Sequence, residues 1–143
     1  MMFDNITNYY LLSVFSAWII SCIIKILINY NKHKKLNLSK GFENGGMPSS
    51  HAALIGSITF ALLLHEGLSP IFFLSFVIAT LILRDAVTVR QEVGLIGIEF
   101  NKMLEKNGEK KLKVIKGHTL KQVIIGLLIG IITTTIFYTQ LLM

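Results

Sequence analysis

Residues Tyr9 to Ile28 read YYLLSVFSAWIISCIIKILI, and this stretch decides the class of fold. It holds about twenty mostly apolar residues, the length that an α-helix needs to cross the hydrocarbon core of a bilayer. Lys25 is its charged residue, and two interpretations of this lysine are open. Its amine can reach the membrane interface from near the helix end, or it can face the interior of a helical bundle as a functional cation. The stretch predicts a membrane-spanning helix. The residues before it contain neither the basic segment nor the small-residue cleavage site of a secretory signal. We therefore expect this helix to be retained and not removed as a signal peptide.

The composition of the whole chain agrees with a membrane protein. Of 143 residues, 52% are hydrophobic and 15% are charged, which is too apolar for an ordinary soluble domain. The net charge of +6 comes from lysines that lie between apolar runs and not along one polar face, so nucleic acid is not the expected partner. These lysines are typical of loops at an anionic membrane surface. The one cysteine, Cys22, excludes a disulfide framework and a cysteine-based metal site.

Three further apolar runs follow the first. We therefore expect residues 1–143 to form a single all-α membrane domain, a helical bundle with about four transmembrane helices. Their expected bounds are roughly 9–30, 49–65, 70–90 and 119–140. Between the last two, residues 92–106 alternate apolar and charged side chains at helical spacing, which predicts an amphipathic helix at the cytoplasmic face of the membrane.

The distribution of positive charge predicts the topology. Most lysines and arginines lie after the first apolar run or between the third and fourth, whereas Asp4 and Glu66 mark the other loops. The positive-inside rule then places both basic segments in the cytoplasm and both termini outside, in a multi-pass protein of the plasma membrane. Residues that are distant in sequence would share the cytoplasmic face: Lys25, Ser49, Ser50, His51, Arg84, Asp85, Arg90 and His118.

The segment Gly45-Gly46-Met47-Pro48-Ser49-Ser50-His51 directly precedes the second run and predicts an anion site. Glycine lets the backbone approach a ligand closely, proline fits the first turn of a helix, and the free N–H groups of a helix start attract phosphate. The alternative interpretation is a loop with an ordinary serine N-cap and a polar histidine.

The cations near this helix start favour an anionic ligand. The positive charges outnumber the negative ones here, with Lys25, Arg84 and Arg90 against Asp85. Alternatively, Arg84 and Asp85 could simply neutralise each other. In the last run, Gly126 and Gly130 have the small-residue spacing that favours close helix contact.

Together these motifs resemble a known family. The GGMPSSH string closely resembles the divergent bacterial and plastid branch of the type 2 phosphatidic acid phosphatase superfamily, which also includes vanadium haloperoxidases. The resemblance runs from Lys25 to about Gly130. It also rests on Asp85-Ala86, Val89-Arg90, Gly94, Asn101, Gly117-His118-Thr119, Val123 and Gly126.

The superfamily builds one phosphate site from three motifs, and each has a counterpart here. Lys25 and Lys32 resemble the first motif, with His33 at its proline position. Pro48, Ser49 and His51 resemble the second, with Ser50 in place of glycine. His118 resembles the histidine of the third motif, whose aspartate position holds Gln122 and whose arginine position holds Leu112.

The resemblance implies a reaction without metal or cofactor. His118 would attack phosphorus, His51 would protonate the leaving alkoxide, and Asp85 would support His118 in place of the missing aspartate. The third-motif arginine could be replaced by Arg84, Arg90, Lys111 or Lys113. The implied phosphate-binding residues are Lys25, Lys32, Gly46, Ser49, Ser50, Arg84 and Arg90. A metal site of His51, His118 and Asp85 lacks a tight ligand spacing.

These implications predict a membrane-embedded phosphatase that hydrolyses a lipid phosphomonoester or diphosphate through a phosphohistidine at the cytoplasmic face. The expected partners are a phospholipid or isoprenoid phosphate and the bilayer, and a homo-oligomer stays open. The alternative functions are binding or transport of a phospholipid headgroup without catalysis in the same pocket, and a structural membrane subunit.

Overall fold

The computed structural model describes residues 2–43 and 45–142, and this part of the chain contains six helices and no strand. The expected all-α class is confirmed. The helices are α1 (Met2–His33), α2 (Ser39–Phe42), α3 (Ser50–Glu66), α4 (Pro70–Val87), α5 (Val89–Lys106) and α6 (Leu120–Leu142).

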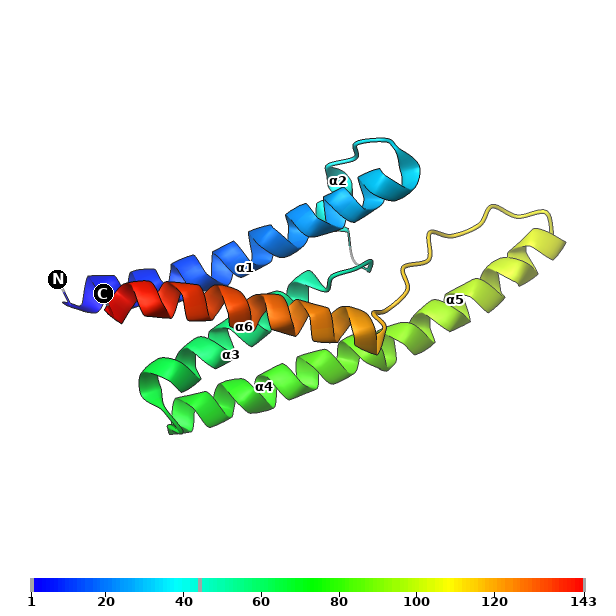
Figure 1. The fold of residues 1–143 in the computed structure, drawn as a ribbon. Helices are drawn as coiled ribbons and strands as arrows, with labels where there is room; N and C mark the ends of the chain where they lie inside the picture. Colours follow the sequence, from blue (N-terminus) through cyan, green and yellow to red (C-terminus); the bar gives the residue numbers. More distant parts are fainter. Residues whose placement is uncertain (1, 44, 143) are drawn as a thin grey trace.

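Helices α1, α3, α4 and α6 lie side by side and alternate in direction (Figure 1). Helix α3 contacts the other three, whereas α4 packs mainly on α3 and little on α6. Both termini lie at one end of the bundle, and the two basic connections lie at the other end. This end also receives the Gly45–Ser49 segment and the start of α6, so the alternating order of the helices gathers the predicted site residues there.

Small side chains form the interior of the bundle. Ala17, Ala52 and Ala61 are fully buried, and the buried hydroxyls of Ser57 and Thr134 hydrogen-bond at 2.7 Å between α3 and α6. Large apolar side chains instead point outward along α1, α4, α5 and α6. This arrangement suits a bilayer, because lipid solvates the apolar exterior and close backbone contact holds the helices together.

The predicted close contact of Gly126 and Gly130 is confirmed. A Cβ atom on Gly126 would collide with the Ser49 carbonyl oxygen, and one on Gly130 would lie 2.5 Å from the Ala53 carbonyl oxygen. Both glycines therefore let α6 approach the first half of α3.

Three helical segments are long and apolar enough to cross a membrane: Thr7–His33, Pro70–Lys106 and Leu120–Gln140. Helix α3 has 17 residues and so spans about 26 Å, slightly less than a typical hydrocarbon core. A count of four transmembrane helices stays a prediction.

The turn between α3 and α4 follows local sequence signals. Helix α3 ends at Gly67, which has a φ of 65°, and the Ser69 hydroxyl accepts a hydrogen bond from the Phe72 N–H at 3.3 Å. Pro70 then begins α4, as expected of a proline in the first turn. The other predicted proline position is wrong: Pro48 lies outside α3, because Ser49 is the N-cap and the helix starts at Ser50.

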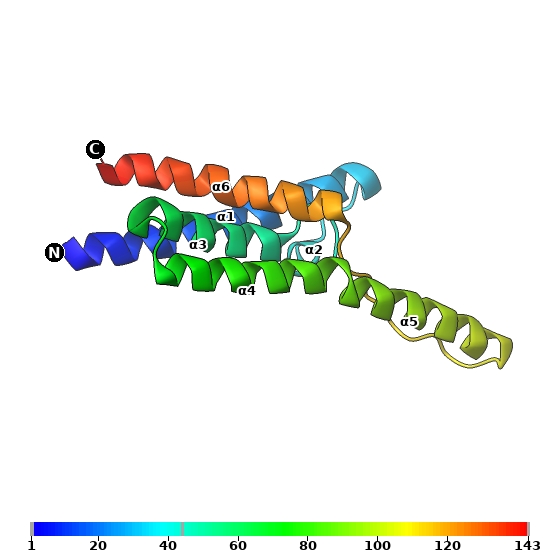
Figure 2. The ribbon, with the colours of Figure 1, turned by 90° about the horizontal axis from the view of Figure 1, so that it is seen from below.

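The third apolar run ends earlier than the expected residue 90. Helix α4 stops at Val87, Thr88 has a φ of −105° and a ψ of −77°, and α5 begins at Val89. Helix α5 continues beyond the end of the bundle and does not fold back across it (Figure 2). The expected residues 92–106 lie within helix α5, while an amphipathic helix on the membrane surface stays a prediction.

Candidate functional site

His118 is placed by the short connection that precedes α6. Its backbone N–H donates to the Ala86 carbonyl at the end of α4 at 3.0 Å. Gly117 allows this approach, because an added Cβ would lie 2.6 Å from the Gln91 nitrogen and 2.8 Å from the Ala86 oxygen. The junction of α4 and α5 therefore fixes the backbone of His118, and the His118 side chain is 5% exposed.

The hydrogen bonds of Gln122 fix the protonation of the His118 ring. The Gln122 side-chain oxygen accepts the Thr119 N–H at 3.0 Å and lies 3.2 Å from His118 Nδ1. Because that oxygen can only accept, Nδ1 carries the proton, and Nε2 of the neutral ring keeps its lone pair. Nε2 is thus the atom of His118 that is available as a nucleophile.

The electrostatic surroundings of His118 favour this neutral form. Burial lowers the pKa of His118 from its ordinary value, and the hydrogen bond to Gln122 raises it in part. The positive charges of Lys25 and His51 lower the pKa further, and a contact with the Gly46 backbone raises it. Burial is the largest of these effects, and it favours the neutral form of the ring. Lys25 and His51 are therefore close enough to His118 for their charges to act on its ring.

An extended segment after α5 delivers His118 to the bundle. The Asn101 side chain donates to the Leu112 carbonyl at 2.9 Å and accepts the Leu112 N–H at 2.8 Å. Further along, Gly94 leaves room for Lys116, and Gly97 leaves room for Val114. A Cβ atom added to either glycine would lie 3.0 Å from the nearest atom of that neighbour. The segment therefore runs back along one face of α5. Leu112, at the position of the motif arginine, is 58% exposed and has its backbone bound to Asn101.

The start of α3 lies against the start of α6. The Ser49 N–H donates to the Gln122 carbonyl at 3.1 Å, and the Ser49 hydroxyl accepts the Ala52 N–H at 3.3 Å as an N-cap. Ser49 and Ser50 are both buried. Gly45 and Gly46 have φ values of 92° and 82°, which favour glycine. His51 follows on the first turn of α3 with an exposed side chain.

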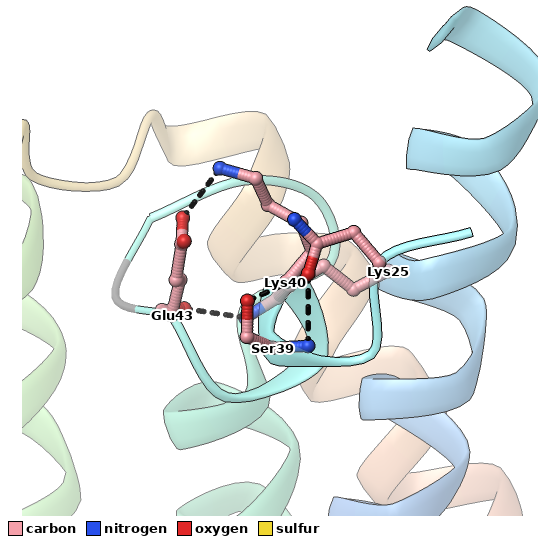
Figure 3. A network of polar contacts seen from close by, with 5 residues as sticks. Lys25, Ser39, Lys40 and Glu43 are labelled. Carbon is pink, nitrogen blue, oxygen red and sulfur yellow. Dashed lines mark hydrogen bonds and ion pairs between the residues drawn. The ribbon is translucent and has the colours of Figure 1, made fainter. Parts of the chain in front are cut away.

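Lys25 lies in the last third of α1 and is 5% exposed, so it faces the interior of the bundle. Its amine donates to the backbone carbonyl of Glu43 at 3.2 Å (Figure 3). The Glu43 carboxylate instead pairs with Lys40 at 2.7 Å, and this hydrogen bond lowers the pKa of Glu43. The Lys25 amine therefore contacts a backbone carbonyl and not the carboxylate, and the Lys25 side chain lies beside Gly46 of the glycine loop.

Two hollows flank this loop. A cavity of about 270 Å³ is bordered by Lys25, Lys32, His33, Lys40, Gly45 and Gly46, among others. A second cavity of about 260 Å³ is lined by Gly45, Arg90, Val93, Ile115, Lys116 and His118. Both are bordered by cationic side chains, so both suit an anionic ligand.

For three other predicted residues, Asp85, Arg84 and Lys111, the contacts that the structure describes do not include the His118 side chain. Asp85 pairs with Arg90, with 2.9 Å between the Arg90 Nε and the carboxylate, so its described partner is this arginine. The Arg84 side chain is exposed near the end of α4. Lys111 pairs with Glu105 at 2.8 Å. Of the cations proposed for the missing motif arginine, Arg90 is the one that lines the His118 cavity.

Sequence reasoning missed Lys116, which lines the same cavity as Arg90 and His118. Its position two residues before His118 was a usable signal, because an extended chain places alternate side chains on one side. It also missed the backbone carbonyl of Glu43 as the partner of Lys25, for which the sequence carries no signal.

The comparisons with known proteins agree with this architecture. The model of the Divergent PAP2 family matches residues 6–133. The uncharacterized membrane protein YuiD of Bacillus subtilis (strain 168) is 34% identical over 151 aligned positions, which cover 93% of this chain and 96% of the relative. No solved structure matches the chain. The match over most of the helical bundle shows that the chain belongs to the Divergent PAP2 family.

Proposed function

We propose that this protein is a membrane-embedded lipid phosphatase that works through a phosphohistidine on His118. The observation that carries the proposal is the ring of His118, which is buried, bonded through Nδ1 to Gln122, and close enough to Lys25 and His51 for their charges to act on it. Nucleophilic histidines need a free lone pair, a fixed orientation and cations for the attacked phosphate, and these residues supply all three.

In the proposed reaction, His118 Nε2 attacks phosphorus and the bond from phosphorus to the leaving oxygen breaks. Protonated His51 donates its proton to that oxygen, so the alcohol or phosphate leaves in protonated form. Neutral His51 then takes a proton from water as the water attacks phosphohistidine, which releases inorganic phosphate and restores both rings.

The cations around the glycine loop would hold the phosphoryl group. Lys25 lines one of the two cavities at the loop, and Arg90 and Lys116 line the other together with His118. Their charges, with the N–H groups of Gly45 and Gly46, would stabilise the negative charge of the transition state. Lys32 also lines the Lys25 cavity, where it would attract an anionic headgroup.

An apolar groove supports a lipid as the substrate. A hollow of about 280 Å³ lies among α3, α4 and α6, with Gly56, Phe60, Phe72, Phe76, Leu83 and Leu127 among its lining residues. Gly56 is five residues from His51 along α3, or about 7.5 Å of helix. A lipid with its phosphate at His118 would place its chain in this groove.

We further propose that α1, α3, α4 and α6 all cross the plasma membrane, with the site in the cytoplasm and both termini outside. The support for this topology is the position of both basic connections at the end of the bundle opposite the termini (Figure 1).

The test is phosphate release by the purified protein in lipid vesicles, from phosphatidic acid and from an isoprenoid diphosphate. We expect vanadate-sensitive release without added metal, and its loss in His118→Ala and in His51→Ala. His65→Ala is the matched control, because His65 pairs with Glu66 at the other end of the bundle. Full activity in both site variants would exclude the mechanism.

Gln122 supports a second candidate function, headgroup binding without catalysis. A neutral amide orients His118 but stabilises a histidine cation less than a carboxylate would. Saturable binding of phosphatidic acid that depends on Lys25, with no phosphate release across the same substrates, would select this function.

A further inference from the structure

The connection between α1 and α3 folds back along α1. Lys34 has a φ of 54°, the left-handed conformation with which many helices end, and its N–H donates to the Tyr30 carbonyl at 2.7 Å. The chain then reverses, so that α2 lies beside the second half of α1 (Figure 1). Residues 36–42 form this return segment, which runs toward the apolar part of α1 and not away from the bundle.

The return segment packs closely on one face of α1. An added Cβ atom on Gly41 would lie 2.9 Å from the Ile26 side chain and 3.3 Å from the Cys22 carbonyl oxygen. The rings of Phe42 and Trp18 have centroids 5.8 Å apart. Trp18, Cys22 and Ile26 are separated by steps of four residues, so they form one line along the helix. The return segment therefore follows this line.

These contacts fix the level of the return segment along the membrane-crossing helix. Ile28 is the last residue of the apolar run, and Ile26 and Cys22 precede it by two and six residues, or about 3 to 9 Å of helix. Segments at a bilayer surface bury their apolar side chains about 5 to 10 Å into the boundary between headgroups and acyl chains. Gly41 therefore lies at that boundary when α1 spans the membrane.

The large apolar side chains of the return segment are exposed. Leu36, Leu38 and Phe42 are 68%, 64% and 68% exposed. The line of α1 next to the contact face is exposed as well, and it consists of Ile19, Ile23 and Leu27. The apolar surface of the return segment thus adjoins the side of α1 that faces lipid, so lipid is the partner that continues across both.

We propose that the return segment is a membrane anchor that inserts Leu36, Leu38 and Phe42 into the cytoplasmic leaflet. Its partner is the boundary between the lipid headgroups and the acyl chains. The proposal rests on α1 as a membrane-spanning helix and on the proposed cytoplasmic position of this end of the bundle. It does not depend on catalysis at His118.

The charges beside the return segment fit a position at lipid headgroups. Lys34 and Lys35 directly precede it and are exposed, so their amines can reach anionic phosphates while their alkyl chains stay in the apolar boundary. The acidic residue that follows the segment, Glu43, pairs with Lys40 at 2.7 Å. This pair offsets the repulsion between Glu43 and an anionic membrane, so the surroundings of the segment are basic.

The backbone of the return segment is suited to a site with little water. The N–H groups of Lys40, Gly41 and Glu43 donate to carbonyl groups three or four residues earlier, at 3.1 to 3.2 Å. The Asn37 side-chain oxygen accepts the Ser39 N–H at 3.1 Å and the Ser39 hydroxyl at 2.6 Å. Backbone groups without a partner are costly in apolar surroundings, so these bonds allow the segment to lie below the headgroups.

The anchor would also set the level of the candidate site. Glu43 directly follows the return segment and its carbonyl accepts the Lys25 amine, and Gly45 and Gly46 come next in the chain. Lys40 and Glu43 border the 270 Å³ cavity beside Lys25. Insertion of the return segment would therefore hold this cavity at the headgroups, where an anionic lipid reaches it without leaving the membrane.

Spin labels on the protein in vesicles measure the depth of the return segment. In a Cys22→Ala background, a nitroxide on Leu38→Cys should collide often with dissolved oxygen, which is enriched in the bilayer, and rarely with a water-soluble nickel chelate. Ile23→Cys is the control for lipid and Lys110→Cys, in the exposed turn after α5, is the control for water. Apolar surroundings exclude a polar chelate, so we expect about tenfold fewer chelate collisions at Leu38→Cys than at Lys110→Cys.

The two collision rates separate lipid from the other surroundings. Chelate access at Leu38→Cys equal to that at Lys110→Cys would place the return segment in water and overturn the anchor. Low access to both oxygen and chelate would show that protein, such as a second copy, covers the segment, and would overturn lipid as its partner. Leu36→Cys should repeat the result of Leu38→Cys, so that the outcome does not depend on one variant. Phosphate release is measured separately, and its absence would refute the phosphatase without changing the depth of the label.

Discussion

The His118 Nδ1 atom and the Gln122 side-chain oxygen lie 3.2 Å apart, and the Thr119 N–H donates to the same oxygen. The glutamine thus performs one task of the aspartate that the wider superfamily has at this position, because it holds the ring with Nε2 free. It does not perform the other task, since an amide adds no negative charge to balance a cationic ring. The pKa of His118 is accordingly set mainly by burial, which lowers it.

Gln122→Glu should raise the pKa of His118, because a carboxylate stabilises the protonated ring. His118 would then take up a proton at a higher pH, and the acidic limb of the activity profile would move to higher pH. Gln122→Met removes the acceptor without adding charge and should lower the rate roughly 5- to 10-fold, the worth of one neutral hydrogen bond. The measurement is phosphate release between pH 4 and 9, a range chosen about the ordinary histidine value near 6.5. An acidic limb that is the same in all three proteins would refute the role of Gln122.

Gly117→Ala should displace His118. The added methyl group would meet backbone atoms of Gln91, Ala86 and Arg90 at 2.6 to 2.9 Å, and backbone cannot move aside as a flexible side chain can. We expect a loss of about 1 to 3 kcal/mol in the free energy of unfolding, as for other overpacked sites, and a loss of activity.

Gly97→Ala is the matched control for this prediction. Its added methyl group would meet the Val114 side chain at 3.0 Å, on a segment at the protein surface that can shift. Thermal unfolding and phosphate release compare the two variants. Similar losses in both would show that the contacts of Gly117 with the α4–α5 junction are not special.

The sequence allowed the main helices and the gathering of the site residues at one end to be predicted, because apolar runs and turn residues act locally. Ser69 and Pro70 begin α4 as their types predict. The path of residues 107–119 could not be predicted, since it depends on contacts between an extended chain and α5. Gly94, Gly97 and Asn101 lie on one helix face at steps of three and four, and this pattern could have indicated a docked segment.

The partners of charged residues were also beyond sequence reasoning. Asp85 was expected to support His118, yet the structure pairs it with Arg90, five residues away on the next helix. The residue types alone allowed Asp85 to pair with either His118 or Arg90. The break between α4 and α5 at Thr88 brings Asp85 and Arg90 together. The glycine loop was easier to foresee, because positive φ angles at Gly45 and Gly46 need glycine.

Asn101→Ala should loosen the segment that carries His118. The side chain makes two hydrogen bonds to the Leu112 backbone, and it is part of an exposed surface. We expect a small loss in global stability, about 1 kcal/mol, but much faster hydrogen exchange at Leu112 and a lower rate of phosphate release. Lys102→Ala, which removes a surface pair with Glu99, should change neither. Unchanged exchange at Leu112 in Asn101→Ala would contradict the anchoring role.

Lys25→Met should separate stability from ligand binding. A buried cation beside a single carbonyl costs free energy of desolvation, so an apolar side chain of similar length should leave the unfolding temperature unchanged or raise it. The affinity for vanadate should fall about tenfold or more, because a hydrogen bond from a charged group contributes about 1.5 to 3 kcal/mol. Lys40→Met is the matched control, since Lys40 borders the same cavity but pairs with Glu43 in an exposed position, where solvent screens its charge. Calorimetric titration with vanadate and thermal unfolding give the two readouts. A destabilised Lys25→Met protein with unchanged vanadate affinity would show that Lys25 supports the fold and does not bind the anion.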